Sequence, residues 1–410
     1  MRQEKGQGQD QGQGFRKNVR LDVALDSFLP LFDTTDAEST SVEDAVGRIA
    51  AADVEAERPV PHYDRAAMDG YAVRAEDTHG ASARSPVRLE AVDEPDTVGE
   101  GQASYVHTGS AVPDGADGVV RIEDTDEFEG TVEVSNAVSE GKNVAYAGED
   151  VSAGETVVSE GARLRPSRLG VLRSVGVETV EVREKPRVAV VPTGDEVVAT
   201  DTDPAPGEVV GTNGPMVAEY VERWGGEPSL CDVVPDDEDA LREAVLEAAE
   251  TAEMVATTGG SSVGERDLLP DVVESLGEVL VHGVAVKPGH PVGVGVVEGT
   301  PVVMLPGYPV SCVVNSFEFV RRGIEESLGA EEAQQPAVRC VLEEKIHSEV
   351  GSRTYTRVKT EKDERIARPV RTKGAGVLSS VADADGFVVT QESREGYAEG
   401  EEGDVLLWEA

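Results

Sequence analysis

Apolar positions in the central part of the chain alternate between two kinds of spacing. Short apolar runs at residues 187–191, 254–258 and 302–305 predict strands, whereas residues 213–224 and 237–252 have the periodicity of amphipathic helices. Strands that alternate with helices along a chain are typical of a parallel sheet with crossover helices. The pattern therefore predicts an α/β domain over residues 185–331.

Two helix starts are marked by polar residues. Asn213 is expected to cap the helix that begins there, because its side chain can accept from a free backbone N–H. Thr40-Ser41-Val42-Glu43 has the form of a capping box. It predicts a helix that ends before Pro59 and has an apolar face of Val42, Ala45, Val46 and Ile49.

The flanking regions are rich in short alternating strands. Segments such as 118–122 and 131–134, separated by Gly, Pro and Asp, predict a small inserted β domain. In the last segment, residues 332–410, glycines separate short strand-like runs. This pattern predicts a small β barrel or sandwich. We expect these parts of a multidomain α/β plus β protein: a disordered Gln/Gly tail at 1–16, an elongated N-terminal domain at 17–58 plus 150–184, the inserted β domain at 59–149, the α/β domain at 185–331 and the β barrel at 332–410.

Charge narrows the choice of partners. The 410 residues include 37 basic and 80 acidic side chains, which gives a formal net charge of -43. Nucleic acid and anionic membranes are therefore excluded as expected partners, because binding to phosphate needs clustered Lys and Arg. The acidic excess is typical of a halophilic surface, which stays soluble where salt screens repulsion. Without an apolar run of roughly 18 residues or an apolar signal core, the protein is expected to be cytoplasmic.

Cysteine usage gives no support for a disulfide framework or a cysteine metal site. Cys231, Cys312 and Cys340 are scattered and odd in number. We expect them to be small buried residues.

Two Gly-containing segments follow predicted strands, at residues 257–267 and 305–309. Their backbone amides and small side chains would meet at the carboxyl ends of the strands, where open α/β sheets bind ligands. Gly259 and Gly264 have Walker A spacing, but Glu265-Arg266 follows in place of Lys-Ser/Thr. The segments therefore predict a cradle for an anion other than a Walker-bound nucleotide.

Four carboxylates are also predicted to follow strands in this domain: Asp195, Glu196, Asp236 and Asp267. Acids beside a phosphate cradle repel an anionic ligand unless a cation intervenes. Mg2+ is favoured over Zn2+ because neither His nor Cys is clustered here. In so acidic a chain, simple solvation accounts for each acid equally well when it is taken alone.

Further motifs lie outside these two segments, at residues 61–73, 108–109, 148–150, 192–196 and 287–291. Together with the Gly-containing segments, they resemble the molybdopterin molybdenumtransferases, the family of MoeA and the gephyrin E domain. The resemblance extends from about residue 20 to the end. It implies a molybdopterin-binding three-layer α/β domain with a parallel sheet, accompanied by the three other domains predicted above.

The resemblance also implies a reaction. Adenylylated molybdopterin would receive molybdate or tungstate and lose AMP, with Mg2+ held by Glu196, Asp236 and Asp267. In a homodimer, Asp69, Thr108 and Asp150 would complete the catalytic site from the other subunit. The implied substrate-binding residues are Thr193, Gly194, Asp195, Thr258, Gly259, Gly260, Ser261, Ser262, Gly264, Lys287, His290, Pro306, Gly307, Pro309, Ser311, Arg353 and Arg357. An upstream adenylyltransferase is a possible partner.

The chain departs from the family's pattern at several positions. His290 stands where the family has a second Lys, so part of the charge that attracts the oxyanion would depend on imidazole protonation. Tyr308 replaces the Asn of Pro-Gly-Asn-Pro, and Ala145 stands where many members have an Arg. Arg353 and Arg357 are candidates to restore the lost positive charge.

Two other functions remain open on these residues. A molybdopterin adenylyltransferase shares the Thr-Gly-Gly type of α/β domain but usually consists of that domain alone. A non-catalytic molybdopterin-binding scaffold would leave the acids dispensable.

Overall fold

The chain folds into two compact units in a computed structural model that describes residues 18–93, 95–260, 268–331, 335–361, 364–370 and 374–409. One unit comprises residues 1–37 and 183–410, and the other comprises residues 38–182. The predicted tail at 1–16 lies outside the described residues. No described helix is both long and apolar enough to cross a membrane.

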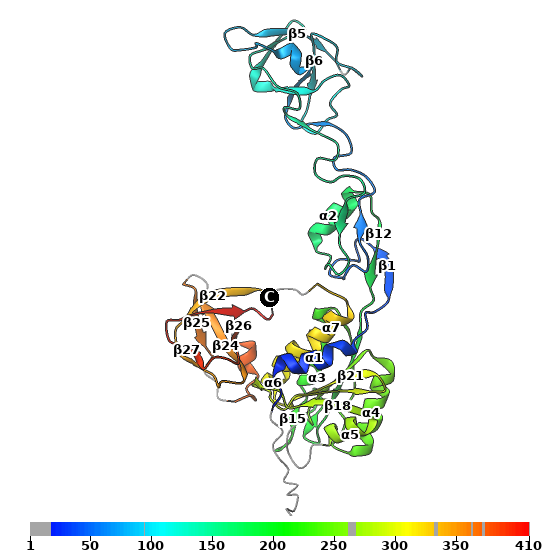
Figure 1. Ribbon diagram of the computed structural model, residues 1–410, viewed down its shortest axis with the longest axis vertical. Coiled ribbons are helices and arrows are strands. Elements are labelled where there is room, and N and C mark those ends of the chain that lie inside the picture. The colour runs from blue at the N-terminus through cyan, green and yellow to red at the C-terminus, as the bar shows by residue number, and fades with distance from the viewer. Residues whose placement is uncertain are drawn as a thin grey trace, which may run out of the picture. The chain divides into compact units, whose positions relative to one another are not determined.

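A six-stranded mixed sheet forms the centre of the first unit (Figure 1). Four neighbouring strands are parallel and two further strands continue the sheet antiparallel. The predicted strands at 187–191, 254–258 and 302–305 are confirmed. In spatial order the strands are β16 (Glu227–Leu230), β13 (Arg187–Pro192), β17 (Met254–Thr258), β21 (Thr300–Leu305), β20 (Gly293–Val297) and β18 (Gly277–His282).

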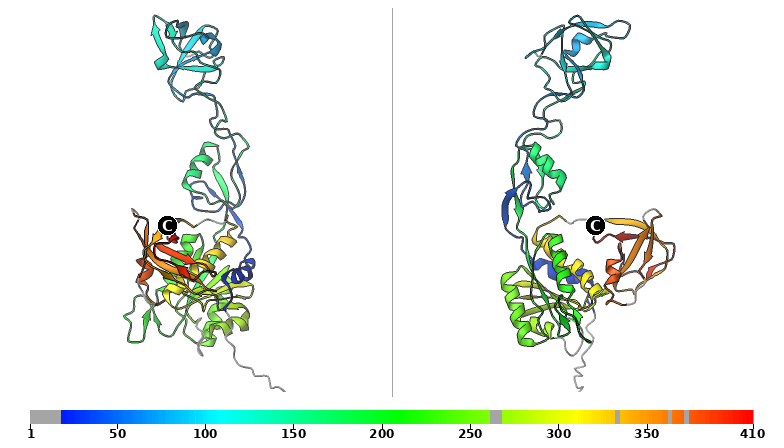
Figure 2. Two further views of the ribbon diagram at one scale, coloured as in Figure 1. Left: turned by 60° about the vertical axis from the view of Figure 1, so that its left-hand side comes forward. Right: turned by 180° about the vertical axis from the view of Figure 1, so that it is seen from behind.

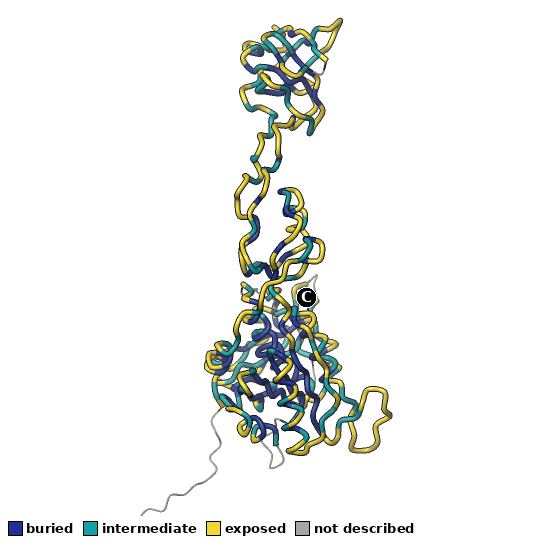
Figure 3. The backbone as a smooth tube through the Cα atoms, turned by 90° about the vertical axis from the view of Figure 1, so that its right-hand side faces the viewer, coloured by how far each residue is buried: buried dark blue, intermediate teal, exposed yellow. Residues whose placement is uncertain are grey.

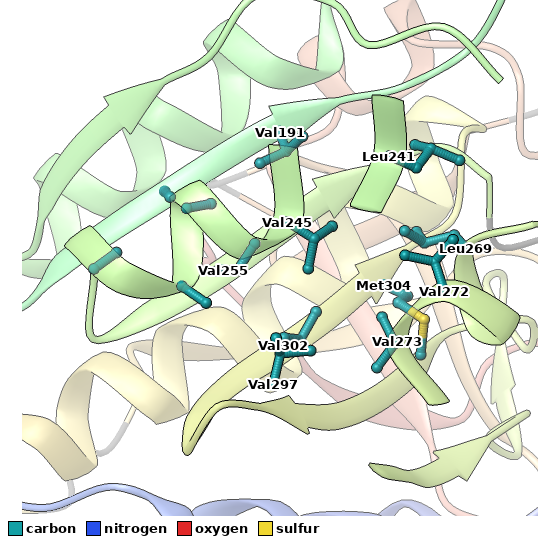
Figure 4. Packing of buried hydrophobic residues seen from close by; sticks show 14 residues of the cluster. Val191, Leu241, Val245, Val255, Leu269, Val272, Val273, Val297, Val302 and Met304 are labelled. Atoms are coloured by element: carbon teal, nitrogen blue, oxygen red, sulfur yellow. The ribbon is translucent and has the colours of Figure 1, made fainter. Parts of the chain in front are cut away.

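Helices cover both faces of this sheet, which confirms the three-layer prediction. On one face, α4 (Glu238–Thr251) and α5 (Leu269–Leu276) bury Leu241, Val245 and Leu269 against strand residues such as Val255 and Val302 (Figure 4). On the other face, the helix that contains Gly323 packs closely on strand β17. A Cβ added at Gly323 would lie only 3.2 Å from Met254 Cε of that strand. The helices of this second face and its neighbourhood are α1 (Leu21–Phe28), α3 (Asn213–Trp224), α6 (Pro309–Asn315), the π-helical turn η4 (Ser316–Val320) and α7 (Arg321–Ser327).

The start of α3 differs from the sequence-based expectation. Thr212 occupies the N-cap position without a side-chain hydrogen bond, and Asn213 is the first helical residue. The Asn213 side chain instead donates from Nδ2 to the Gly307 carbonyl at 2.7 Å. The predicted cap is therefore wrong: the Asn213 side chain bonds to a distant loop and accepts from no N–H of its own first turn. By contrast, Asp237 caps α4 by accepting from Ala240 N at 3.0 Å.

The C-terminal strands form a closed β barrel, which confirms that predicted class (Figure 2). Its ring closes because β26 pairs with both β24 and β28. The ring consists of β24 (Arg353–Glu361), β25 (Ile366–Pro369), β22 (Ala337–Leu342), β28 (Glu402–Leu406) and β26 (Gly386–Thr390). The short β19 (Val286–Lys287) from the preceding segment extends this sheet by pairing parallel with β24.

The second unit contains a six-stranded sheet and a separate smaller core. The sheet consists, in spatial order, of β7 (Gly118–Arg121), β4 (Gly70–Val73), β6 (Gln102–Val106), β5 (Val87–Val92), β9 (Thr131–Val134) and β8 (Thr125–Phe128). The smaller core lies among β1 (Ala37–Ser41), β12 (Thr179–Arg183), β2 (Val54–Glu55), β11 (Thr156–Val158) and α2 (Pro166–Ser174). Buried segments of the backbone are dark blue in Figure 3. The exact domain boundaries given above stay a prediction.

The helix predicted from the capping box at residues 40–43 is wrong. Ser41 ends strand β1, and its Oγ accepts from Asp44 N at 3.1 Å within a turn. Gly47 then has a φ of 89°, which a continuing right-handed helix does not allow. Val42 and Ala45 are buried as predicted, but Val46 is 40% exposed. Strand pairing and one turn thus bury the apolar residues that the pattern assigned to a helix face.

The remaining short elements connect these layers. They are η1 (Leu29–Leu31), β3 (Arg65–Ala66), η2 (Ala75–Thr78), η3 (Ile122–Asp124), β10 (Val144–Ala145), β14 (Val197–Val198), β15 (Val209–Val210), β23 (Ile346–His347), α8 (Ser379–Ala382) and β27 (Gly396–Tyr397).

Candidate functional site

A cavity of about 640 Å³ lies at the carboxyl ends of three parallel strands. Strands β13, β17 and β21 end at Pro192, Thr258 and Leu305, so the loops that follow them meet at one edge of the sheet. The first loop contributes Thr193 and Glu196 to the cavity wall. The cavity therefore lies where the sequence predicted an anion cradle.

The second and third loops contribute the predicted glycines and prolines. Strand β17 and its loop supply Thr258, Gly259 and Gly260, and the loop after β21 supplies Pro306, Gly307 and Pro309 to the wall. The structure thus brings these predicted binding residues together. Ser261, Ser262, Gly264 and Asp267 lie outside the described residues, so their predicted roles stay predictions.

Gly259 is required by the close approach of two loops. Its φ is 139°, and a Cβ there would lie 2.4 Å from the Thr193 carbonyl oxygen and 2.9 Å from Thr193 Oγ1. Its backbone N–H donates to Leu305 O at 3.1 Å. Only glycine allows the chain to turn this sharply against Thr193 while it stays bonded to β21.

The cavity wall also includes residues that the sequence reasoning missed. Asn213 lines it, and the bond of its side chain to Gly307 fixes the third loop to the start of α3. Tyr308, noted above only as a departure from the family, lines the cavity and is 67% exposed. For Asn213, the sequence offered one signal: an Asn at the start of a predicted helix, shortly after the apolar pair at residues 209–210.

The C-terminal part of the first unit reaches the same cavity. Gly376 and Leu378 line it, and Val310 N donates to Ala375 O at 3.0 Å. These residues lie in the segment assigned to the β barrel from sequence, where nothing marked them as site residues. The cavity therefore combines the α/β layers with a loop from the barrel.

Three acids lie close together: Asp195 and Glu196 of the first loop, and Asp236. Asp236 N donates to Asp195 Oδ1 at 3.0 Å, and Asp195 N is 3.4 Å from Asp236 Oδ2. Burial raises the pKa of Asp236 above its ordinary value, and the negative charges of Asp195 and Glu196 raise it further, while the backbone bond from Asp195 acts in the opposite direction. Glu196 lines the cavity itself. The described residues contain no group of three or more His, Cys, Asp or Glu that would by itself hold a metal ion.

The predicted basic residues do not line the cavity. Lys287 forms an ion pair with Glu349, and this pairing lowers the pKa of the Glu349 carboxyl. His290 is exposed and uses its backbone carbonyl to accept from Val284 N at 2.9 Å. Ser311 is buried near the start of α6.

Two arginines of the barrel differ in their partners. Arg353 forms an ion pair with Glu392, in which Arg353 Nε lies 3.1 Å from Glu392 Oε1. Arg357 donates from Nη1 to Ser380 Oγ at 2.7 Å, and burial lowers the pKa of its guanidinium. Ser380 was not predicted. It lies two residues after Leu378, so it belongs to the same segment that borders the cavity.

The second unit holds the other predicted catalytic residues. Asp69 Oδ1 accepts from Thr108 N at 2.6 Å and from Thr108 Oγ1 at 2.8 Å. These two bonds lower the pKa of Asp69. Asp150 donates its backbone N–H to Val60 O at 3.0 Å. The structure thus joins Asp69 to Thr108, and both side chains are exposed.

Family models match nearly the whole described chain. The MoeA N-terminal region (domain I and II) matches residues 19–176, the model named "Probable molybdopterin binding domain" matches residues 189–326, and the MoeA C-terminal region (domain IV) matches residues 339–408. A molybdopterin biosynthesis protein of Methanocaldococcus jannaschii is 35% identical over 378 residues, which are 90% of this chain and 92% of that protein. The chain belongs to the MoeA family.

Other relatives agree with this assignment. The molybdopterin molybdenumtransferase of Staphylococcus aureus is 29% identical and covers 91% of this chain and 92% of its own length. The crystal structure of a molybdopterin biosynthesis MoeA protein from Pyrococcus horikoshii superposes with a TM-score of 0.81 at 37% identity. It covers 96% of this chain and 100% of its own. This MoeA family member is accordingly a transferase of molybdenum cofactor biosynthesis.

Proposed function

We propose that this MoeA family member inserts molybdate into adenylylated molybdopterin and releases AMP. The observation that carries the proposal is the cavity in which the Thr-Gly-Gly turn, the Pro-Gly turn and Glu196 meet at one edge of the sheet. Small residues there let the backbone approach an anionic ligand closely. Tungstate has the same tetrahedral form and charge, so the oxyanion can be either one.

Divalent-ion chemistry fits the donor set beside this cavity. Burial is the main cause that raises the pKa of Asp236, and the nearby charges of Asp195 and Glu196 add to it, so a cation would relieve that repulsion. All of the donors are oxygens, which suits Mg2+, an ion that usually takes one or two carboxylates together with substrate phosphates. Glu196 and Asp236 would hold it, with Asp267 as the third predicted ligand. When bound, Mg2+ would neutralise charge on the phosphoryl oxygens.

The chain's own residues then perform binding and orientation. Gly259 and Gly260 bring backbone close to the ligand, and their turn lies directly against the buried Thr193. The bond between Asn213 and Gly307 keeps the third loop in place as the ligand enters. These residues position the pyrophosphate link for attack without acting as covalent nucleophiles.

The oxyanion would be attracted by basic side chains from the segments around the barrel. Arg357 has a hydroxyl partner in Ser380, so its positive charge is available to an anion. Lys287 would exchange its exposed partner Glu349 for the oxyanion, which costs little because exposed ion pairs are weak. Arg353 already has Glu392 and would contribute less.

The activity is tested by incubating the purified protein with adenylylated molybdopterin, Mg2+ and molybdate or tungstate, and by measuring AMP release and cofactor formation. Asp236→Asn should lower turnover strongly, because it removes a ligand of the ion. Asp232→Asn, an exposed acid of the same loop, is the matched control. Consumption of ATP with molybdopterin would instead indicate an adenylyltransferase, and binding without AMP release would indicate a scaffold.

We also propose a homodimer with a shared site. Asp69 and Thr108 would face Glu196, Asp236 and Asp267 of the second subunit. Supporting this, Asp69 holds Thr108 through two hydrogen bonds at an exposed position, as expected for a preformed half of a site. Mixing an Asp69→Ala protein with an Asp267→Ala protein should restore partial activity, since hybrid dimers contain one intact site. The shared site is refuted if subunits exchange and activity does not return.

The proposed reaction also specifies its supplier. Its substrate already carries an adenylyl group, so an enzyme that adenylylates molybdopterin must act before it. Direct transfer from such an enzyme would protect the substrate. A pull-down between the two purified proteins, with and without molybdopterin, tests whether they associate.

A further inference from the structure

Tyr308 stands out among the residues of the cavity wall. It is the single aromatic residue among the described residues that line the cavity, and 67% of its surface is exposed. The same cavity is also lined by the aliphatic residues Val209, Val210 and Leu378. A large exposed ring in a cavity with aliphatic lining offers a surface for a planar apolar face of a ligand.

The backbone of Tyr308 is held at several points. Asn213 Nδ2 donates to the carbonyl of the preceding residue, Gly307, at 2.7 Å. The carbonyl of Tyr308 itself accepts from Cys312 N at 2.9 Å as α6 begins. The ring therefore projects from a segment that is fixed on both sides.

The ring also packs against the loop from the barrel. A Cβ at Gly376 would lie 3.4 Å from Tyr308 Cδ1 and 3.6 Å from Cε1, which is ordinary van der Waals contact. The neighbouring Ala375 accepts from Val310 N at 3.0 Å. The Gly376 backbone thus lies beside one part of the ring, while most of the ring stays exposed. Such preorganisation lowers the entropy lost when a ligand stacks on it.

We propose that Tyr308 is a specificity-determining residue that stacks on a planar nitrogen heterocycle of the substrate. The inference rests on the proposed function, because adenylylated molybdopterin contains two such rings, the pterin and the adenine. Offset stacking between a tyrosine ring and a heterocycle adds attraction beyond simple burial, whereas an Asn at this position has no aromatic face.

The proposal is tested by calorimetric titration of the full chain with three probes: pterin, AMP and inorganic phosphate. Tyr308→Leu should weaken binding of the stacked ring about fivefold, whereas Tyr308→Phe should stay within about twofold of the unchanged protein. Whichever of pterin and AMP loses affinity identifies the ring. Phosphate has no ring, so its affinity should not change. Phe128→Leu, which removes a ring that is 71% exposed in the other unit, is the matched control.

Two results overturn the inference. One is equal affinity of the Tyr308→Leu and unchanged proteins for both rings. The other is an equal loss for phosphate, which would mean that the loop had rearranged. Turnover separates this inference from the proposed function. If the unchanged protein releases AMP and the KM of Tyr308→Leu is unaltered, the proposed role of Tyr308 is wrong but the transferase reaction stands. Absence of AMP release from the unchanged protein removes the transferase reaction itself.

Discussion

Replacing Gly259 by alanine should disrupt the centre of the cavity wall. The new Cβ would lie 2.4 Å from the Thr193 carbonyl oxygen, a distance that no real Cβ tolerates. The obstructing atom belongs to the backbone, so a change of side-chain rotamer cannot relieve the clash. Either the turn at Gly259 or the end of β13 must move.

The expected cost has two parts. A φ of 139° is strained for any residue with a Cβ and costs about 1–3 kcal/mol. Forcing extra atoms into a filled space costs about 1–3 kcal/mol more. Gly299, in the turn between β20 and β21, has a φ of 92°, but no described atom lies within 4 Å of its added Cβ. Gly299→Ala is therefore a matched control that carries the conformational cost without the clash.

Hydrogen exchange at the backbone amides of β17 measures the difference. A clash of about 1–3 kcal/mol should speed exchange there roughly 5- to 150-fold in Gly259→Ala relative to Gly299→Ala. Affinity for phosphate should fall in the same variant, because the turn no longer presents its backbone. Equal protection of β17 in the two variants would refute the reasoning that the approach to Thr193 requires glycine.

Three further outcomes are expected. Tyr355→Phe removes the hydrogen bond from a buried tyrosine to the buried Glu318 and should cost about 1–3 kcal/mol in denaturant unfolding, whereas Tyr397→Phe, which loses only a 3.4 Å bond, should cost less. Burial and the neighbouring Glu409 raise the pKa of Tyr220, so the folded state keeps a proton that the unfolded state releases above about pH 10. Stability should therefore fall as pH rises above about 10, and Tyr220→Phe should reduce that slope; an unchanged slope contradicts the assignment. Melting temperature should fall when salt is diluted from about 1 M to about 0.1 M, because the net charge of -43 is then screened less; a constant midpoint would contradict a halophilic surface.

The sequence by itself determined the α/β layers and the anion-binding edge. Strands β13, β17 and β21 were predictable because apolar runs of this length bury best in a covered parallel sheet. The site glycines were predictable for a related reason. Chain topology alone places loops that follow parallel strands at one edge, so Thr193, Gly259 and Gly307 had to converge.

Only the tertiary structure decided which local signals prevailed. The capping box at residues 40–43 does not start a helix, because strand β1 pairs with β12 instead. A strand partner satisfies more backbone groups than one capped turn. Asn213 does not cap its helix, and its side-chain amide donates instead to the carbonyl of Gly307, 94 residues away in sequence. Contacts between residues this far apart in sequence produce no periodic pattern of apolar positions. For the same reason, the place of Gly376 and Tyr308 on one cavity wall became visible only when the barrel loop and the start of α6 were seen in contact.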